Sequence, residues 1–579
     1  MDVNTASPYV REASRSWSLA YLLLSLTSPL LVTYLVSLWN SSTTVRKYTD
    51  PRRPPTAPYY LPYIGHAIEF VTNPYGLYER NWKRFGRDGL WKLCLPGQES
   101  YQVSTADQVA KVFRAQNMIM SESHARSLEY SFGMPKRAAA LYENDDSGYG
   151  PHIAPGSKVK PNERILLTQH DFTARNLSGD SLTSIVSHYQ HYLVETLTEL
   201  HDGMGDGWVE IPDLTEFVHD HVTKSAIISM FGPHLIRLNP DFVQDIWAFV
   251  PDVLHLFLRL PRWLLPKAYR LRDKLLDGIM RYYQHAYENY DPNGPGQDWE
   301  EFFGSRFTRT KHMELWEQFE PMDSRARAAE DLSFLWASNA NSVEAAVWFL
   351  VELLRDADLM NRVRAEAADS QTPPVSEPSA PMFDLEKLCS MPVAQAIYAE
   401  VLRLRVAILV MRKAKHDLDF AGWSIKKGER VGAASVARSL DERIWNTGTA
   451  EEPHPLHEFW ADRFLVYPEK PASGPLKNPP VRRSEDEEKH PSSNGPRFSM
   501  TGLTNTWIPY SGGARLCPGR HFAKREIIVT AAVLISMFDI ELLTPEGWDP
   551  QPAVSIFGSG TLPIKGKVPC RIRKKQQHT

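Results

Sequence analysis

Cysteine is scarce in this chain of 579 residues. There are four, at Cys94, Cys389, Cys517 and Cys570, and no two share a CxxC spacing. That pattern excludes a zinc site of the usual paired type. A chain of this length does not need disulfides to hold its core, so all but Cys517, whose context is special, are expected to be buried small hydrophobes or inert thiols. The formal net charge of −4 gives no bias toward a nucleic-acid partner.

Long apolar runs are also rare, and one stands out near the N-terminus. Residues 17–39 have the charge-free sequence WSLAYLLLSLTSPLLVTYLVSLW. A helix of about 23 residues can cross a bilayer core, and Trp17 and Trp39 suit its two interfaces. The alternatives are a cleaved signal peptide, whose apolar stretch should be shorter, and a buried helix, which Pro29 disfavours. We predict a single-pass transmembrane anchor.

Basic residues follow this span closely, whereas few precede it. Those that follow are Arg46, Lys47, Arg52 and Arg53, and those that precede it are Arg11 and Arg15, together with two acids. The positive-inside rule then places the rest of the chain in the cytosol.

The chain divides into an N-terminal tail (1–16), the anchor (17–39), a basic, proline-rich linker (40–62) and one large domain (63–579). Five prolines between Asp50 and Pro62 predict a stiff, extended connector. Residues 469–499 are polar and proline-rich and contain SEDEEK. With almost no large apolar side chains, this segment cannot bury a core, and we predict a disordered surface insertion. It is either a solvated loop or a partner-binding segment.

Helical periodicity dominates the large domain, and no internal repeat is evident. Apolar residues recur at helical spacing in two stretches, Val343 to Leu354 and Ile397 to Leu404. Short strands are predicted over residues 90–95, 423–425 and 571–573. Residues 426–429 (KKGE) have the composition of a hairpin turn. The expected fold class is mainly α with small β-sheets.

A glycine-rich loop surrounds Cys517. It has the sequence Tyr510-Ser-Gly-Gly513-Ala-Arg515-Leu-Cys517-Pro-Gly519-Arg and leads into an apolar helical stretch. In an iron–thiolate site, the sulfur must reach the metal without bulky side chains around it. The glycines of this loop have no side chain and allow that close approach. Backbone N–H groups at the start of the following helix can stabilise the anionic sulfur. The alternative is a chance glycine-rich turn before a helix.

Two further motifs precede this loop. Glu400-Val-Leu-Arg403 places an acid and a base at i and i+3 on one helix face. Alone, such a pair usually marks only a surface ion pair. The later segment FWADRF carries Arg463, which can complete a Glu400–Arg403–Arg463 network. A buried network of this kind needs all of its members, because a lone buried charge is costly.

Together, the three motifs resemble the cytochrome P450 family in order and spacing, and the anchor and linker extend the resemblance over nearly the whole chain. The resemblance implies a mostly helical cytochrome P450 fold with haem between two long helices. It implies Cys517 as the axial iron ligand, and Glu400, Arg403 and Arg463 as a structural triad. It also implies that Arg515 and Arg412 contact haem propionates; His170 is either another such contact or a surface histidine.

This sequence departs from the family pattern in two places. The phenylalanine usual at the start of the cysteine loop is Tyr510, whose ring can still shield the sulfur. The central helix usually carries an acid and a threonine that manage protons, but here Ala340 and Asn341 hold those positions. The sequence of residues 336–341, WASNAN, resembles the branch of the family that contains sterol 7α- and 12α-hydroxylases and prostacyclin synthase. Without the usual pair, Ser342, Ser338 or a substrate hydroxyl must help to deliver protons.

Three functions follow as expectations. The first is a monooxygenase in the endoplasmic reticulum membrane that oxidises an apolar sterol, terpenoid, polyketide or lipid. Its electrons would come from NADPH through a separate reductase, because the chain has no flavin- or nicotinamide-binding fingerprint. Asn341 also allows a reductase-independent isomerase or dehydratase that acts on a peroxide. A haem-binding protein without catalysis is the third.

Two more segments carry functional interpretations. Residues 253–266, VLHLFLRLPRWLLP, mix basic and apolar side chains. They are either a segment that dips into the bilayer near the substrate entrance or an ordinary buried helix and turn. Residues 557–562, FGSGTL, either line the substrate pocket or form a plain turn.

Overall fold

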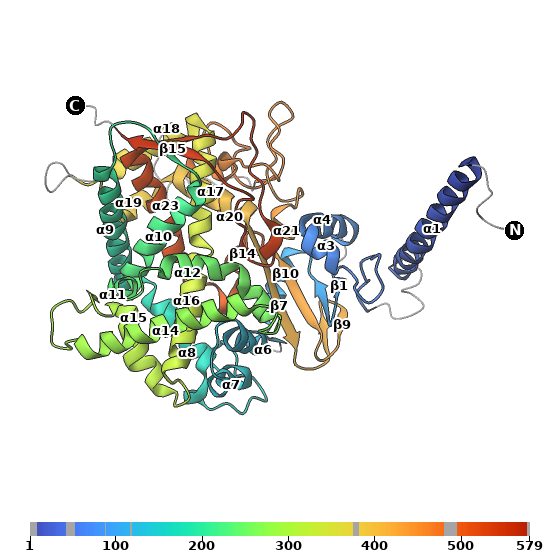
Figure 1. The fold of residues 1–579 in the computed structure, drawn as a ribbon, viewed down its shortest axis with the longest axis horizontal. Coiled ribbons are helices and arrows are strands. Elements are labelled where there is room, and N and C mark those ends of the chain that lie inside the picture. Colours follow the sequence, from blue (N-terminus) through green and yellow to red (C-terminus); the bar gives the residue numbers. More distant parts are fainter. Residues whose placement is uncertain are drawn as a thin grey trace.

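Helices form most of the molecule, and the largest sheet lies along one side of them (Figure 1). The structure is a computed structural model that describes residues 8–41, 52–86, 89–115, 118–373, 381–479 and 495–575. Its α-helices are α1 (Pro8–Asn40), α3 (Ala67–Thr72), α4 (Pro74–Phe85), α5 (Ala106–Arg114), α6 (Ser121–Arg126), α7 (Lys136–Asn144), α8 (Ile165–Asn176), α9 (Gly179–Gly203), α10 (Leu214–Phe231), α11 (His234–Arg237), α12 (Phe242–Phe249), α13 (Val253–Phe257), α14 (Pro266–Asn289), α15 (Arg306–Thr310), α16 (Ser324–Asn339), α17 (Ser342–Arg355), α18 (Ala357–Ser370), α19 (Leu385–Ser390), α20 (Pro392–Arg405), α21 (Ser435–Ser439) and α23 (Arg520–Met537).

The strands are short, and most pair antiparallel. They are β1 (Trp91–Leu95), β2 (Gln98–Gln102), β3 (Met118–Ile119), β4 (Val209–Ile211), β5 (Trp299–Glu300), β6 (Gly304–Ser305), β7 (Val406–Ala414), β8 (Leu418–Phe420), β9 (Trp423–Ile425), β10 (Arg430–Ala434), β11 (Leu465–Val466), β12 (Arg497–Phe498), β13 (Phe538–Leu542), β14 (Ser559–Thr561) and β15 (Cys570–Lys574). The largest sheet has the order β1-β2-β10-β7-β14, with β3 on the other end of β7. The three predicted strands correspond to β1, β9 and β15.

The predicted hairpin at residues 426–429 is only a turn. Glu429 N–H donates to the Lys426 carbonyl at 3.0 Å, and Gly428 has φ +85°. However, the strands on either side do not pair with each other, because β9 pairs with β8 and β10 pairs with β2 and β7. The turn therefore carries the chain from one sheet to another.

The core is built around α17, α20 and α23. Helix α17 is apolar around most of its circumference, so it is covered on all sides, as expected for such a helix. It packs against α23, α20 and α10. The indole N–H of Trp348 in α17 donates to the Leu562 carbonyl at 2.7 Å, which ties the helix to the chain just after β14. The two predicted apolar stretches, near residues 343–354 and 397–404, thus become central helices.

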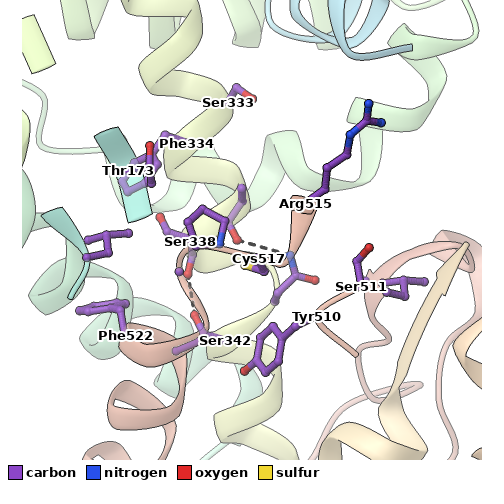
Figure 2. Close-up of a pocket in the computed structure, with 18 of the residues that line it drawn as sticks. Thr173, Ser333, Phe334, Ser338, Ser342, Tyr510, Ser511, Arg515, Cys517 and Phe522 are labelled. Carbon is purple, nitrogen blue, oxygen red and sulfur yellow. Dashed lines mark hydrogen bonds between the residues drawn. The ribbon is translucent and has the colours of Figure 1, made fainter. Parts of the chain in front are cut away.

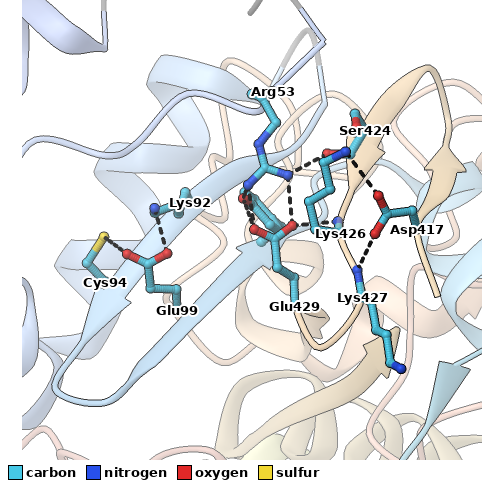
Figure 3. Close-up of polar contacts among 10 residues, drawn as sticks. Arg53, Lys92, Cys94, Glu99, Asp417, Ser424, Lys426, Lys427 and Glu429 are labelled. Atoms are coloured by element: carbon cyan, nitrogen blue, oxygen red, sulfur yellow. Dashed lines mark hydrogen bonds and ion pairs between the residues drawn. The ribbon is translucent and has the colours of Figure 1, made fainter. Parts of the chain in front are cut away.

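The N-terminal connector docks onto the largest sheet through Arg53 (Figure 3). The guanidinium of Arg53 pairs with Glu429, donates to the Ser424 carbonyl at 2.9 Å and to the Tyr101 hydroxyl at 2.6 Å. The Ala57 N–H donates to the Lys92 carbonyl and the Lys92 N–H donates to the Pro55 carbonyl, which continues the attachment along β1. The body of the domain therefore extends into the predicted linker, of which residues 42–51 lie outside the described part.

The predicted membrane span, residues 17–39, lies within helix α1, which contains Pro29. Figure 1 shows α1 beyond the body of the molecule. The side chains of residues 17–20, 22, 23 and 26 lie outside the described set. Among the residues that the structure describes, no helix is both long enough and apolar enough to cross a membrane.

The predicted insertion, residues 469–499, has ordered flanks. Its middle, residues 480–494, lies outside the described residues. On one side, the Asn446 side-chain amide donates to the carbonyls of Ala472 and Gly474 at 3.1 and 2.8 Å. On the other side, β12 pairs with β11. Hydrogen bonds to distant segments thus hold these flanks, although they have few apolar side chains, and the disordered insertion stays a prediction.

Candidate functional site

A cavity of about 480 Å³ lies next to Cys517. Its walls come from α8, α16, the start of α17, β14 and the cysteine loop. Figure 2 shows Ser338, Ser342 and Phe522 around the cavity, with the Cys517 sulfur among them. Ser559, Gly560 and Thr561 also line it, so the predicted pocket contribution from residues 557–562 is confirmed, in a strand and not in a plain turn.

The loop that presents Cys517 depends on Gly513. Gly513 has φ +66°, and an added Cβ would lie 2.6 Å from the Phe113 carbonyl oxygen, so only glycine fits. The Cys517 N–H donates to the Tyr510 carbonyl at 3.0 Å, which closes the loop. Gly519 differs, because a Cβ there would lie 3.9 Å from the sulfur, an ordinary contact. Packing within the protein therefore explains the first glycine but not the second.

The Cys517 thiol lies at the start of α23, as the sequence predicts. Burial raises the pKa of the Cys517 thiol, and backbone N–H groups of Gly519 and Arg520 and the charge of Arg520 lower it. A thiol under these opposing influences loses its proton when a metal cation binds the sulfur. Among the described residues, no group of three or more His, Cys, Asp or Glu side chains could hold a metal ion.

The phenol of Tyr510 is anchored to helix α20. Its hydroxyl lies 2.8 Å from the hydroxyl of Tyr398, and its ring meets the Trp507 ring edge-on, with the centroids 6.0 Å apart. Burial raises the pKa of Tyr510 well above its ordinary value, so the phenol stays neutral. Tyr510 therefore links the cysteine loop to the helix that carries Glu400.

The structure brings Glu400, Arg403 and Arg463 together. The Arg403 guanidinium donates to both Glu400 oxygens at 2.7 and 2.8 Å, and Arg463 Nε donates to one of them at 3.1 Å. All three side chains are fully buried. Arg403 also donates to the Ser439 carbonyl, and the Trp460 N–H donates to Glu400. The two guanidinium groups hold the pKa of Glu400 below its ordinary value.

Two arginines, Arg412 and Arg515, lie close together beside the cavity. Arg412 is buried, and desolvation together with the charge of Arg515 lowers the pKa of Arg412 to about 9. Arg515 stacks on the Tyr149 ring at 4.3 Å, and its Nη1 is buried without a hydrogen-bond partner among the described residues. Buried cations of this kind call for an anionic partner.

The family model for cytochrome P450 matches residues 54–568. The chain belongs to the cytochrome P450 family. It is 37% identical over 574 residues to the cytochrome P450 monooxygenase fsoE of Humicola fuscoatra, covering 95% of each chain. It is also 37% identical over 575 residues to the cytochrome P450 monooxygenase efuG of Hormonema carpetanum, covering 97% of this chain and 98% of the relative.

More distant relatives of this P450 match the predicted branch. The cholesterol 7-alpha-monooxygenase of Cricetulus griseus is 25% identical over 539 residues, covering 90% of this chain and 93% of the relative. The prostacyclin synthase of Bos taurus is 24% identical over 555 residues, covering 90% of this chain and 94% of the relative. The predicted resemblance to this branch is thus confirmed, and the chain is an oxidoreductase of the monooxygenase family.

The family implies a haem–thiolate cofactor, and the residues present fit it. Cys517 offers one sulfur at the cavity, and the unpartnered Nη1 of Arg515, with Arg412, suits the two propionates of haem. His124 is a group that the sequence did not single out. Its Nε2 is buried and has no partner in the described part of the chain, and burial, together with the charge of Arg515, lowers the pKa of His124 to about 4. When bound, haem supplies oxygen chemistry that the thiolate favours.

His170 of helix α8 contacts the cysteine loop. Its Nε2 lies 3.2 Å from the Leu516 carbonyl, and its ring meets the Tyr149 ring edge-on. It lines the cavity, but its polar contact is with the backbone of the cysteine loop. We therefore infer that His170 holds this loop against α8, and its predicted contact with a propionate stays a prediction.

The central helix is interrupted where the sequence departs from the family pattern. Helix α16 ends at Asn339 and α17 begins at Ser342, with Ala340 and Asn341 between them. Asn341 Nδ2 lies 3.4 Å from the Ala337 carbonyl, and its Oδ1 accepts the Thr561 N–H at 2.9 Å. Asn341 thus joins the helix to β14. A Cβ at Gly560 would lie 1.8 Å from Asn341 Oδ1, so this contact requires glycine in β14.

A second residue that the sequence did not single out is Glu526 in α23. It is fully buried, and neither of its carboxyl oxygens has a hydrogen-bond partner among the described residues. Burial raises the pKa of Glu526 to about 8. The signal in the sequence was an acid that interrupts the apolar stretch HFAKREIIVTAAVLISM after Cys517.

Proposed function

We propose that this P450 is a membrane-bound monooxygenase that inserts oxygen into a large apolar molecule, with electrons from NADPH through a separate reductase. The observation that carries the proposal is the Cys517 thiol at a largely apolar cavity, next to cationic groups that suit haem propionates. Both relatives at 37% identity are named as fungal P450 monooxygenases. A sterol, terpenoid or polyketide of secondary metabolism is the proposed substrate class.

Asn341 bears on the choice between a monooxygenase and a peroxide isomerase. A peroxide isomerase would require the Asn341 carboxamide to bind an oxygen of the peroxide substrate. Here its acceptor oxygen already takes the Thr561 N–H, and its amide faces the Ala337 carbonyl. This geometry favours the monooxygenase. Prostacyclin synthase among the relatives keeps the isomerase or dehydratase as the second candidate.

Turnover under labelled oxygen gas separates the two functions. We expect label in the product, and only when reductase and NADPH are both present, because insertion consumes oxygen and two electrons. The substrate is first found from spectral shifts of the purified protein against sterols, terpenoids, fatty acids and polyketides. Product formed from a peroxide without reductase and without label would overturn the monooxygenase proposal and leave the haem assignment intact.

A location in the endoplasmic reticulum membrane, with the catalytic domain in the cytosol, is part of the proposal. Helix α1 exposes large apolar side chains, among them Leu24 and Leu35. After α13, the segment predicted to dip into the bilayer exposes Leu258, Trp263 and Leu264, and Trp263 is 81% exposed. Such side chains, next to the basic Arg259 and Arg262, suit a membrane interface.

Carbonate washing and protease protection test this location. We expect the full chain to stay with microsomal membranes in carbonate and the domain to be digested by protease added outside intact vesicles. Removing residues 1–49 should loosen the attachment without abolishing it, and adding Trp263→Ser with Leu264→Ser should release the protein. Release of the full chain by carbonate would exclude the anchor, and protection from protease would reverse the orientation.

A further inference from the structure

One carboxyl group lines the cavity in the described part of the chain, that of Glu330 in α16. The residue is only 4% exposed. Much of the cavity wall is apolar, with Leu166, Met230 and Phe334 among its members. A buried carboxyl group in an apolar wall is costly unless hydrogen bonds satisfy it, so its presence at a cavity calls for an explanation.

Two side chains hold Glu330 in place. The Gln169 side-chain amide of α8 donates to Glu330 Oε1, and the Tyr142 hydroxyl of α7 donates to Glu330 Oε2 at 3.3 Å. The buried Lys311 pairs with Asp331 instead, and within the described residues no cation forms an ion pair with Glu330. A carboxylate has about four lone-pair sites, so Glu330 can accept a further hydrogen bond from the cavity.

Ser333 lies on the same face of α16, three residues after Glu330, and also lines the cavity. No hydrogen bond joins its hydroxyl to another described residue. The hydroxyls of Thr173, Ser338 and Ser342 differ, because each of them donates to a backbone carbonyl. Glu330 and Ser333 therefore form a polar patch whose hydrogen-bonding capacity the described protein groups do not use up.

The polar patch lies at a distance from the sulfur of Cys517. Figure 2 shows Ser333 farther along α16 from Cys517 than Ser338 is. Glu330 precedes Ser338 by just over two helical turns, which is about 12 Å along a helix axis. A ligand that spans from the patch to the sulfur must therefore have a body of about that length, as fused-ring molecules do.

We infer that the substrate carries a hydroxyl group at the end remote from the oxidised carbon, and that Glu330 and Ser333 bind this hydroxyl. The inference rests on the proposed monooxygenase function and narrows its substrate class to apolar ring systems with an alcohol at one end. A hydroxyl can donate to a carboxylate and accept from a protonated acid, so it fits both forms of Glu330. Both forms are populated near neutral pH, because burial raises the pKa of Glu330 to about 7. An ammonium group has only donors and suits the ionised form alone.

Ligand binding to the haem-loaded protein tests the inference without turnover. The probes are two alcohols and their parent hydrocarbons, androstanol with androstane and cholestanol with cholestane, each followed by spectral titration. We expect the alcohol to bind about tenfold more tightly than its hydrocarbon, because the hydrocarbon leaves the buried polar groups of the patch unpaired. If neither alcohol binds more tightly than its hydrocarbon, the inference is overturned. Tighter binding of androstanylamine, the matching amine, than of androstanol would assign the patch to cationic ligands and overturn it too.

Variants of the two patch residues locate the preference. Glu330→Met should reduce it to about twofold or less, and Ser333→Ala should reduce it as well, with the affinity for the hydrocarbon kept. Glu330→Gln should keep part of the preference, because an amide still donates and accepts. Its matched control is Glu344→Gln, since Glu344 is also buried but bonds to His219 at 3.0 Å. Ser324→Ala, at the exposed start of α16, is the control for Ser333→Ala.

Haem content per chain shows whether each variant is folded. If Glu330→Met does not fold, Ser333→Ala decides, because its hydroxyl has no described partner to lose. The wild-type preference for the alcohol in Ser333→Ala and in every folded variant of Glu330 would overturn the inference. The titrations use neither NADPH nor reductase, so they are independent of the labelled-oxygen assay. Protein that prefers the alcohols but forms product without reductase would overturn the monooxygenase and leave the hydroxyl site in place.

Discussion

Cys517→Ala is expected to lose the absorption spectrum that carbon monoxide gives with a haem–thiolate protein. Cys517 presents one sulfur to the cavity, and the backbone N–H groups of Gly519 and Arg520 favour its anionic form. Without the sulfur, any haem that stays bound has a different axial ligand, and the push of electron density that the thiolate supplies is gone. We expect product formation to fall below detection, because Cys517 is the one cysteine among the described residues that line the cavity.

The measurement is the carbon-monoxide difference spectrum together with haem content per chain. Cys517→His separates ligand identity from occupancy, because imidazole can bind iron but gives a spectrum of another type. Cys389→Ala and Cys570→Ala are matched controls, since both thiols are buried and far along the chain from the loop. Each should keep the thiolate spectrum despite a small loss of stability. An unaltered spectrum in Cys517→Ala would remove the assignment of this residue as the ligand.

The motifs that could be predicted from sequence are those whose chemistry is local. The Cys517 loop needs its glycine at a left-handed position and a helix after it, and both requirements are visible in the chain. Glu400 and Arg403 lie one helical turn apart, so their pairing follows from spacing. Arg463 joins them across 63 positions, and only the resemblance to a family could place it there.

The features that could not be predicted depend on tertiary contacts. The break between α16 and α17 carries Asn341, whose side chain meets β14 more than 200 positions away. Glu526 and the Nε2 of His124 are unusual only because their surroundings bury them, and burial is a property of the packed molecule. The flanks of 469–499 also depend on tertiary contacts. The Asn446 side chain donates to the Gly474 carbonyl, and the composition of the flank does not predict this bond.

Glu400→Ala is expected to give little haem-loaded protein. The substitution leaves the guanidinium groups of Arg403 and Arg463 buried without their shared carboxylate. Breaking one partner out of a buried ion pair typically costs about 3–5 kcal/mol of stability, a large share of the ~5–15 kcal/mol of a folded protein. Because Arg403 also donates to the Ser439 carbonyl and Glu400 accepts the Trp460 N–H, the loss should loosen the segments that these bonds hold.

The free energy of unfolding in denaturant and the haem content per chain measure this effect. Glu541→Ala is the matched control, because Glu541 pairs with Arg571 at the surface, where an ion pair contributes about 0–1 kcal/mol. Glu400→Gln should recover little, since a neutral amide leaves both positive charges uncompensated. The lowered pKa of Glu400 means that its stabilisation is present at neutral pH and is lost as the pH falls below the ordinary carboxyl range. Wild-type haem content and stability in Glu400→Ala would show that the network does not support the haem site.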